Sequence, residues 1–174
     1  GRRFALGWGD RMAVRMCTLV FAVSRVYLDH TIEVDTASSI SRLPSSFLLI
    51  ANHQSIVDIP VLVTAFRRYR LRFVAKSSLF SGVPLISPLL RLQGHAAVHR
   101  SPSGEARRDT LEQLDTLIAR IPSGISPVVF PEGTRTRDGS VGRFRSGAAF
   151  HLLRCCNLPI VAVAMNGGWK VATA

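Results

Sequence analysis

Short apolar runs and helix-like segments alternate along the chain after residue 30. The runs that we interpret as strands are Thr31–Val34, Phe47–Ala51, Leu71–Ala75, Ala96–His99, Ser126–Phe130 and Pro159–Met165. The segments that we interpret as helices are Pro60–Arg70, Leu79–Leu92, Pro102–Ile121 and Gly147–Cys156. Strands that alternate with helices are typical of α/β domains, in which helices cover both faces of a largely parallel sheet. The pattern therefore predicts a single α/β domain over residues 31–174, with a mostly parallel central sheet.

The clearest helix is the segment 102–121. Its apolar residues recur with a period of 3.6, at Leu111, Leu114, Leu117, Ile118 and Ile121. Ser101 followed by Pro102 is a good combination of N-cap and first helical residue, so we expect the helix to begin there.

The first thirty residues differ from the rest. The stretch Met12–Leu28 is mostly apolar, but Arg15 and Arg25 interrupt it, so it falls short of a membrane-spanning helix. Apolar positions with basic residues at intervals fit a helix that lies in the membrane interface; an ordinary amphipathic helix packed on the domain is the alternative. We expect residues 1–30 to form such a membrane-associating helix, at the cytoplasmic face of the cell membrane.

Positive charge is in excess along the whole chain of 174 residues. There are 22 Lys+Arg against 11 Asp+Glu, a net charge of +11, and all the basic residues except Lys76 and Lys170 are arginines. With 47% hydrophobic residues the chain is not disordered, and its charge indicates an anionic partner: nucleic acid, a membrane surface or a phosphorylated substrate. Only 7% of residues are aromatic, and no arginines flank a stacking platform, which argues against nucleic acid.

The cysteines and most histidines carry no recognisable chemistry. Cys17, Cys155 and Cys156 neither suggest a disulfide framework nor show zinc spacing, so we expect a reducing compartment and no metal. The histidines without a matching partner in the sequence, which we expect to be structural, are His30, His95, His99 and His151.

The functional residues of parallel α/β sheets usually lie in the loops beyond the carboxyl ends of the strands. One such loop holds His53 and Asp58, which suggests an imidazole base oriented by a carboxylate. Five residues apart in a continuous helix they would diverge, so the pairing requires a turn at His53, with Asp58 near the start of a helix that Pro60 helps to open. Taken alone, the spacing also fits a structural histidine with an unrelated aspartate.

A second loop, after Ser126–Phe130, is rich in glycine and arginine. Its glycines allow close backbone approach and its arginines suit phosphate oxygens. These residues are Gly133, Gly139, Gly142, Arg135, Arg137, Arg143 and Arg145. The embedded Glu132 either positions Arg135 or hydrogen-bonds a substrate hydroxyl; a solvated charged loop is the alternative.

Two further cations end strands. Arg100 follows Ala96–His99 and precedes a helix N-terminus, which makes it a candidate for a phosphate site. Lys76 follows Leu71–Ala75 and either contacts phosphate or is simply solvated.

Four ordered segments resemble the motifs of the glycerolipid acyltransferases, most closely those of the 1-acylglycerol-3-phosphate acyltransferases. Asn52–Asp58 (NHQSIVD) resembles the first motif, Phe130–Arg135 (FPEGTR) the third and Leu158–Val161 the fourth. Arg100 stands where the second motif keeps its arginine, although His99 precedes it where many relatives have an acid. The similarity spans roughly residues 48–167. Relatives usually continue past the fourth motif, so we expect this chain to be a piece of a longer protein.

The resemblance implies a fold of the glycerol-3-phosphate acyltransferase type and transfer of a fatty acyl group to the free sn-2 hydroxyl of lysophosphatidic acid, giving phosphatidic acid. The donor would be acyl-CoA or acyl carrier protein, with no metal or redox cofactor. His53 with Asp58 would deprotonate the hydroxyl without a covalent acyl-enzyme. The residues implied to hold the substrate are Lys76, Arg100, Glu132, Gly133, Thr134 and Arg135.

Alternative functions stay open at this point. Another lysophospholipid or a lyso-ornithine lipid could be the acceptor, since the first and third motifs are shared across acceptors. A serine hydrolase would need a GxSxG nucleophile elbow, which the sequence lacks. A lipid-binding relative without catalysis would have little reason to keep both His53 and Asp58.

Overall fold

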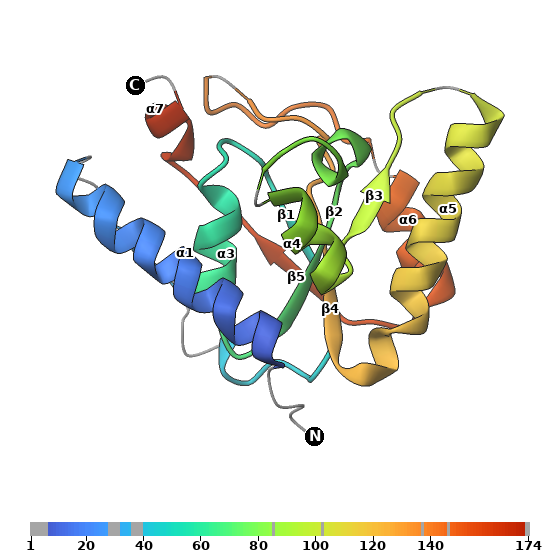
Figure 1. The fold of residues 1–174 in the computed structure, drawn as a ribbon, viewed down its shortest axis with the longest axis horizontal. Helices are drawn as coiled ribbons and strands as arrows, with labels where there is room; N and C mark the ends of the chain where they lie inside the picture. The colour runs from blue at the N-terminus through green and yellow to red at the C-terminus, as the bar shows by residue number, and fades with distance from the viewer. Residues whose placement is uncertain are drawn as a thin grey trace.

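The computed structural model describes residues 7–27, 32–35, 40–84, 86–101, 103–136, 138–145 and 147–172. In these residues one sheet is formed by β1 (Leu48–Ala51), β2 (Arg70–Lys76), β3 (Ala96–Val98), β4 (Ile125–Val129) and β5 (Ile160–Val163). The strand order is β3-β2-β4-β1-β5, and every neighbouring pair is parallel. The predicted α/β domain with a parallel sheet is therefore confirmed (Figure 1).

Helices lie on both sides of this sheet (Figure 1). The described α-helices are α1 (Trp8–Tyr27), α3 (Asp58–Ala65), α4 (Ile86–Gln93), α5 (Gly104–Ala119), α6 (Gly147–Cys155) and α7 (Gly168–Ala172). Two short 3₁₀ helices, η1 (Ser77–Phe80) and η2 (Ile121–Ser123), precede α4 and β4. In Figure 1, α1 and α3 cover the left side of the sheet, and α5 and α6 cover the right.

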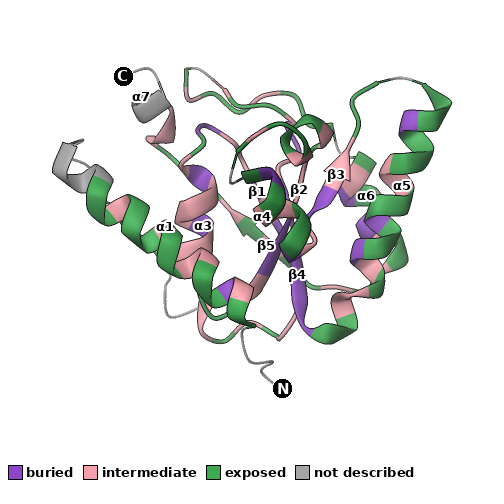
Figure 2. Ribbon diagram, viewed as in Figure 1, coloured by how far each residue is buried: buried purple, intermediate pink, exposed green. Residues whose placement is uncertain are grey.

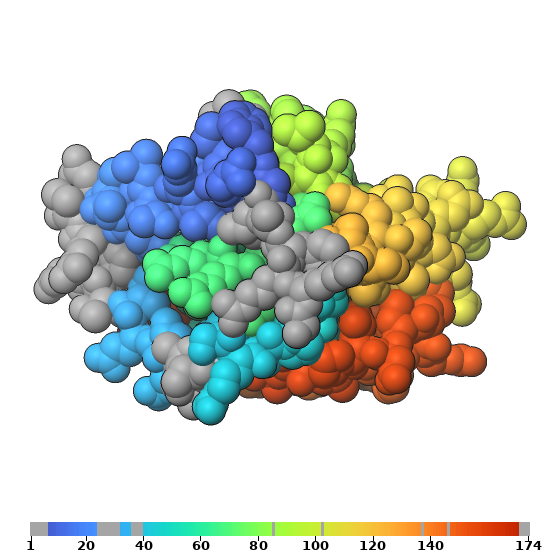
Figure 3. Space-filling view, turned by 90° about the horizontal axis from the view of Figure 1, so that it is seen from below, coloured from blue at the N-terminus to red at the C-terminus, as the bar shows by residue number. Residues whose placement is uncertain are grey.

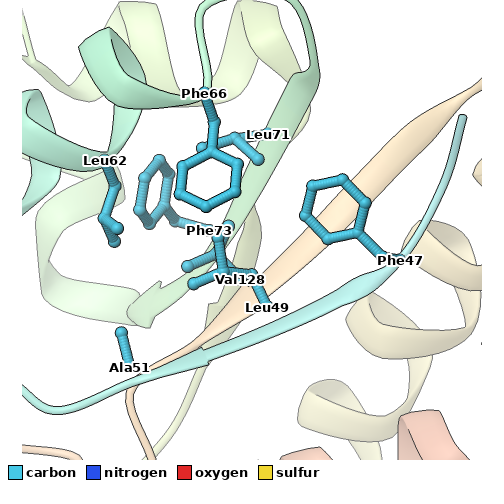
Figure 4. Close-up of a cluster of buried hydrophobic side chains, with 8 residues drawn as sticks. All are labelled: Phe47, Leu49, Ala51, Leu62, Phe66, Leu71, Phe73 and Val128. Carbon is cyan, nitrogen blue, oxygen red and sulfur yellow. The ribbon is translucent and has the colours of Figure 1, made fainter. Parts of the chain in front are cut away.

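The core consists of two apolar clusters, one on each face of the sheet, because successive residues of a strand point to opposite faces. The cluster under α3 contains Phe47, Leu49, Ala51, Leu62, Phe66, Leu71, Phe73 and Val128 (Figure 4). The cluster under α5 and α6 contains Leu48, Ala96, Leu114, Leu117, Ile125, Val129, Ala149 and Leu152. Buried residues accordingly gather along the central strands (Figure 2), and all five residues of β4 are buried.

The register of the strands brings the loops of interest to one edge. Ala51 of β1 is level with Val163 of β5, and Ile50 is level with Val129 of β4. Because these parallel strands end side by side, the loops that begin at Asn52 and Phe130 and the segment that begins at Ala164 lie together at the carboxyl edge.

Two predicted elements, one strand and one helix, differ in the structure. Thr31 lies outside the described residues, and residues 32–34 form no strand because two apolar side chains flanking Glu33 are too few to be buried. The segment predicted as one helix over Leu79–Leu92 is divided into η1 and α4 at Pro84. Pro88 is tolerated within α4 because it lies in the first turn, where its missing N–H has no helical partner.

The predicted start of the helix over 102–121 was wrong by two residues. The N-cap of α5 is Ser103, whose hydroxyl accepts a hydrogen bond from the Ala106 N–H at 3.2 Å. Ser101 instead accepts a bond from the Ser103 N–H, and Pro102 lies outside the described residues. Both serines satisfy the same rule, and the backbone geometry of residue 103 decides between them.

The N-terminal helix α1 packs beside α3 and α4 (Figure 3) and is anchored by buried polar contacts at its first turn. Asp10 accepts from Arg72 at 2.7 Å and from Arg70 at 3.1 Å, and the Gln93 amide donates to the Gly9 carbonyl. Burial by itself raises the pKa of Asp10, but the hydrogen bonds and charges of the two arginines outweigh it and leave that pKa below its usual value. No helix in the described ranges combines the length and apolar content that crossing a bilayer requires.

Candidate active site

The loop after β1 turns so that His53 meets Asp58. His53 Nδ1 lies 2.8 Å from Asp58 Oδ2, and Asp58 is the first residue of α3, the position that the spacing required. The same carboxylate oxygen accepts the backbone N–H groups of Gln54 at 2.6 Å and Ser55 at 2.8 Å. Asp58 is 2% exposed, so these hydrogen bonds replace the water that a buried carboxylate loses.

The His53 ring is held at its edge and at its face. A carboxylate can only accept, so in the neutral ring Nδ1 carries the proton and Nε2 keeps its lone pair. The ring also stacks on Phe130, with centroids 4.2 Å apart and planes 17° apart. The side chain of His53 is 16% exposed, which leaves part of it accessible from solvent. The arrangement is that of an oriented imidazole base.

Glu132 joins the two chemistry-bearing loops through their backbones. Its Oε1 accepts the N–H of His53 at 2.8 Å, and its Oε2 accepts the N–H of Gly142 at 2.7 Å. The His53 carbonyl in turn accepts the N–H of Thr136 at 3.0 Å. Glu132 is 2% exposed with both oxygens engaged, so a bond to a substrate hydroxyl would have to share one of them.

Arg100 reaches from the end of β3 to the loop after β4. Its guanidinium donates to the carbonyl of Gly133, which has φ +65°, a conformation that favours glycine. Arg100 therefore brings the second candidate motif into contact with the third. Arg100 is exposed, so the rest of its guanidinium is accessible from solvent.

The remaining predicted site residues are exposed at the same edge. Lys76 ends β2 level with Val98 of β3, and Thr134 and Arg135 follow Gly133. Among the described contacts, none joins these three side chains to the His53–Asp58 pair. Arg137 lies outside the described residues.

Two residues of the first motif, Asn52 and Gln54, hold parts of the site that sequence reasoning did not assign to them. Asn52 exchanges two hydrogen bonds with the backbone of Met165, at 2.8 and 2.7 Å. Gln54 is 2% exposed and bonds to the backbone of both Gly139 and Gly168. Their partners are 85 to 114 residues away along the chain, so only the folded structure could reveal these contacts.

Comparison with known proteins decides the family. The family model described as Acyltransferase matches residues 31–166. The chain belongs to the acyltransferase family. The resemblance of its motifs to that family is thereby confirmed.

The curated relatives that the chain resembles are longer members of this acyltransferase family. It is 30% identical over 135 residues to the chloroplastic 1-acyl-sn-glycerol-3-phosphate acyltransferase BAT2 of Brassica napus, a match covering 76% of this chain and 37% of that one. It is 24% identical over 152 residues to the chloroplastic LPAT1 of Arabidopsis thaliana, covering 87% and 40%. The chain thus spans about two fifths of the length of these relatives.

A solved member of the family shares the fold. The crystal structure of the 1-acyl-sn-glycerophosphate (LPA) acyltransferase PlsC from Thermotoga maritima aligns with a TM-score of 0.65 and 22% identity. The alignment covers 87% of this chain and 55% of that one. The expected fold is therefore present.

None of the other described histidines of this acyltransferase-family chain is hydrogen-bonded to the His53–Asp58 pair. His95 is buried, and desolvation, followed by the charge of Arg72, lowers its pKa to about 3, so it is neutral and structural, as expected. His151 Nε2 lies 2.7 Å from Asp115 and joins α6 to α5, a partner 36 residues away that sequence reasoning did not find. His99 precedes Arg100, and its backbone N–H donates to the hydroxyl of Thr110 at 3.0 Å. His30 lies outside the described residues.

Proposed function

We propose that the chain forms the catalytic part of a 1-acyl-sn-glycerol-3-phosphate O-acyltransferase. Such an enzyme transfers a fatty acyl group from acyl-CoA or acyl carrier protein to the sn-2 hydroxyl of lysophosphatidic acid and releases phosphatidic acid. The observation that carries the proposal is the pair of a partly exposed His53 and a buried Asp58 at the carboxyl edge of the sheet, in a chain of the acyltransferase family. The names of the relatives support lysophosphatidic acid as the acceptor.

In this proposal His53 acts as a general base. Asp58 keeps the proton on Nδ1, and Nε2 accepts the proton of the acceptor hydroxyl as its oxygen attacks the thioester carbonyl. The tetrahedral intermediate collapses, the C–S bond breaks, and Nε2 returns the proton to the departing thiolate. An ester and a free thiol result, and the step needs neither a covalent acyl-enzyme nor a redox change. Placing the hydroxyl against the carbonyl supplies much of the acceleration.

The phosphate of the acceptor would lie among the exposed cations of the same edge. Arg100 is held against the loop at Gly133, with Thr134 and Arg135 following, and Lys76 ends the neighbouring β2. Arginine presents planar N–H groups that bind phosphate oxygens in pairs. Glu132 supports this site by holding both loops through their backbones.

The experiment that tests the function follows the acyl group. Labelled acyl-CoA is incubated with the chain and lysophosphatidic acid, and in parallel with other lysophospholipids and a lyso-ornithine lipid. We expect labelled phosphatidic acid, and no labelled protein when the acceptor is omitted. Transfer to a different acceptor alone would overturn the acceptor, and a labelled protein would overturn the direct mechanism. The absence of transfer to every acceptor would overturn the function.

We further propose that α1 lies in the membrane interface at the cytoplasmic face. Its inner side packs on the domain, whereas its outer side exposes large apolar residues. These are Trp8, Met12, Met16, Leu19, Val20 and Val23. Exposed apolar side chains interspersed with arginines suit an interface of acyl chains and anionic headgroups.

Sedimentation with vesicles tests this location. We expect the chain to co-sediment with vesicles containing phosphatidylglycerol, and the double variant Leu19→Glu, Val23→Glu to remain in solution. Equal sedimentation of both proteins would contradict a role for α1.

A further inference from the structure

The segment that follows β5 lies against the loop of the proposed catalytic pair. Asn52 holds Met165 through two hydrogen bonds, and Gln54 Oε1 accepts the N–H of Gly168 at 3.1 Å. Gln54 Nε2 donates to the carbonyl of Gly139 at 3.2 Å, so one buried side chain ties two distant segments together. A side chain at Gly139 would collide with the indole of Trp169, which shows how closely these segments approach.

Gly168 leaves room for the Asp58 carboxylate. A Cβ atom at residue 168 would lie 2.9 Å from Asp58 Oδ1, closer than Cβ atoms normally approach an oxygen, and 3.6 Å from the Cβ atoms of Gln54 and Ser55. The backbone of Gly168 has an ordinary φ, unlike that of Gly167 at +85°, so conformation alone does not require glycine there. Glycine is required at residue 168 because a side chain there would collide with the Asp58 carboxylate.

The two oxygens of Asp58 have different surroundings. Oδ2 accepts from His53 Nδ1 and from two backbone N–H groups, while Oδ1 faces the space that a side chain at residue 168 would occupy. A side chain at residue 168 would displace this oxygen, and Gln54 holds the backbone of Gly168 beside it. Asp58 and Gln54 are both buried, so water cannot easily replace their hydrogen bonds.

We propose that Gly168 and Gln54 are positioning residues of the acyl transfer: the glycine leaves the Asp58 carboxylate the space for the orientation that aligns His53, and the Gln54 side chain holds that glycine in place. The inference rests on the proposed function. It extends the active site to the segment after β5, and it gives Gln54 a role distinct from that of the neighbouring pair. Neither residue contacts the substrate in this account, so their loss should lower kcat and leave the acceptor KM unchanged.

The test compares Gly168→Ala and Gln54→Met with the control Gly9→Ala, which adds a methyl group where nothing lies within 4 Å. A displacement of about 1 Å at a catalytic group can lower the rate about 100-fold. We expect kcat to fall roughly 10- to 100-fold in both variants, with the acceptor KM and the control unchanged. In Gly168→Ala combined with Asp58→Asn, we expect no loss beyond that of Asp58→Asn alone. If the loss of kcat in the double variant equalled the product of the two single losses, the proposal would be overturned.

A spectroscopic readout separates this inference from the proposed function. The ring N–H proton of His53 that is hydrogen-bonded to Asp58 gives a low-field NMR resonance, assigned by its loss in His53→Gln. We expect Gly168→Ala and Gln54→Met to shift or broaden it, and Gly9→Ala to leave it unchanged. An unchanged resonance with kcat within twofold of the parent protein would overturn the positioning role, even if acyl transfer is confirmed. A shifted resonance in a chain without acyl transfer would leave the positioning of the pair standing and remove the function.

Discussion

His53 and His95 lie at the two ends of one row of aromatic rings, yet their surroundings give them different chemistry. His53 stacks on Phe130, Phe130 faces Phe73 with centroids 6.2 Å apart, and Phe73 contacts His95 at 5.6 Å. Both histidines also have a buried aspartate in their neighbourhood. Proximity to aromatic rings and to an acid therefore does not distinguish a base from a structural histidine.

The difference lies in how many ring nitrogens the fold uses. His95 accepts the N–H of Phe73 at Nδ1 and bonds Gln93 through Nε2, so both nitrogens are engaged. His53 uses Nδ1 for Asp58, and the contacts of the described residues include no partner for its Nε2. A partly exposed ring with one nitrogen left over can take a proton from a substrate, whereas His95 can only hold β2 and α4 together.

The largest effect is expected from Asp58→Asn. The amide offers Nδ1–H a weaker acceptor and can present N–H groups where Gln54 and Ser55 already donate, so it favours the wrong tautomer of His53. We expect kcat to fall about 10³- to 10⁴-fold. The unfolding free energy should fall by no more than about 1–3 kcal/mol. Steady-state kinetics with urea unfolding measures both. A loss of stability without a loss of kcat would make Asp58 structural, like the groups around His95.

A substitution in the polar cluster around Asp10 should lower the unfolding free energy and leave kcat nearly unchanged. Asp10→Asn leaves the buried Arg72 without its carboxylate, and breaking a buried ion pair in this way costs about 3–5 kcal/mol. We expect urea unfolding to reveal that loss while kcat, measured well below the midpoint, stays within twofold of the parent protein. A large fall in kcat at full folding would contradict the separation of the two regions.

Acid should weaken the His95 region. The pKa of His95 is lowered to about 3 in the folded chain by burial, against an ordinary value of 6.5, so below pH 6.5 the unfolded chain binds a proton that the folded chain excludes. The stability that neutral His95 contributes is present above pH 6.5 and declines on acidification, by about 2 kcal/mol at pH 5. Urea unfolding at about pH 5 and 7.5 measures it. The His95→Gln variant should lose this part of the pH dependence. If the unfolding free energy changed equally with pH in both proteins, His95 would not be the group responsible.

A smaller effect is expected from Arg100→Ala. Removing a charged donor from the proposed phosphate site should raise the acceptor KM roughly tenfold and leave kcat nearly unchanged, since a charged hydrogen bond at an exposed position contributes at the low end of about 1.5–3 kcal/mol. Acceptor titrations at saturating acyl-CoA measure it, with Arg108→Ala on the exposed surface of α5 as the matched control. An unchanged KM would remove Arg100 from the phosphate site.

Most of the sheet could be predicted because its strands are local apolar runs bounded by turns. Five of the six expected strands are present within a few residues, and the exception, Thr31–Val34, has too little apolar surface in its described part to bury. The periodic residues of α5 likewise predicted that helix, although its cap is Ser103 rather than Ser101. Such features depend on short stretches of sequence, which is why they are readable without the fold.

The frame around the site could not be predicted in the same way. The spacing of His53 and Asp58 required a turn, which the structure has, but the hydrogen bonds of Glu132, Asn52 and Gln54 to backbone groups join residues from 10 to 114 positions apart. Glu132 was expected to position Arg135 or to hydrogen-bond a substrate hydroxyl, and the structure adds that its two oxygens accept backbone N–H groups. Almost every residue offers the same backbone N–H and C=O groups, so the sequence does not reveal which of them a side chain will bind.

The central claim is that His53 supplies the base of an acyl transfer. The most direct measurement is the rate of phosphatidic acid formation from labelled acyl-CoA and lysophosphatidic acid by the parent chain and by His53→Ala, both at saturating substrate. General-base catalysis contributes about 10²- to 10⁴-fold, so the account predicts a fall of that size in kcat, with an unchanged urea midpoint. Equal rates of phosphatidic acid formation by the two proteins would contradict it.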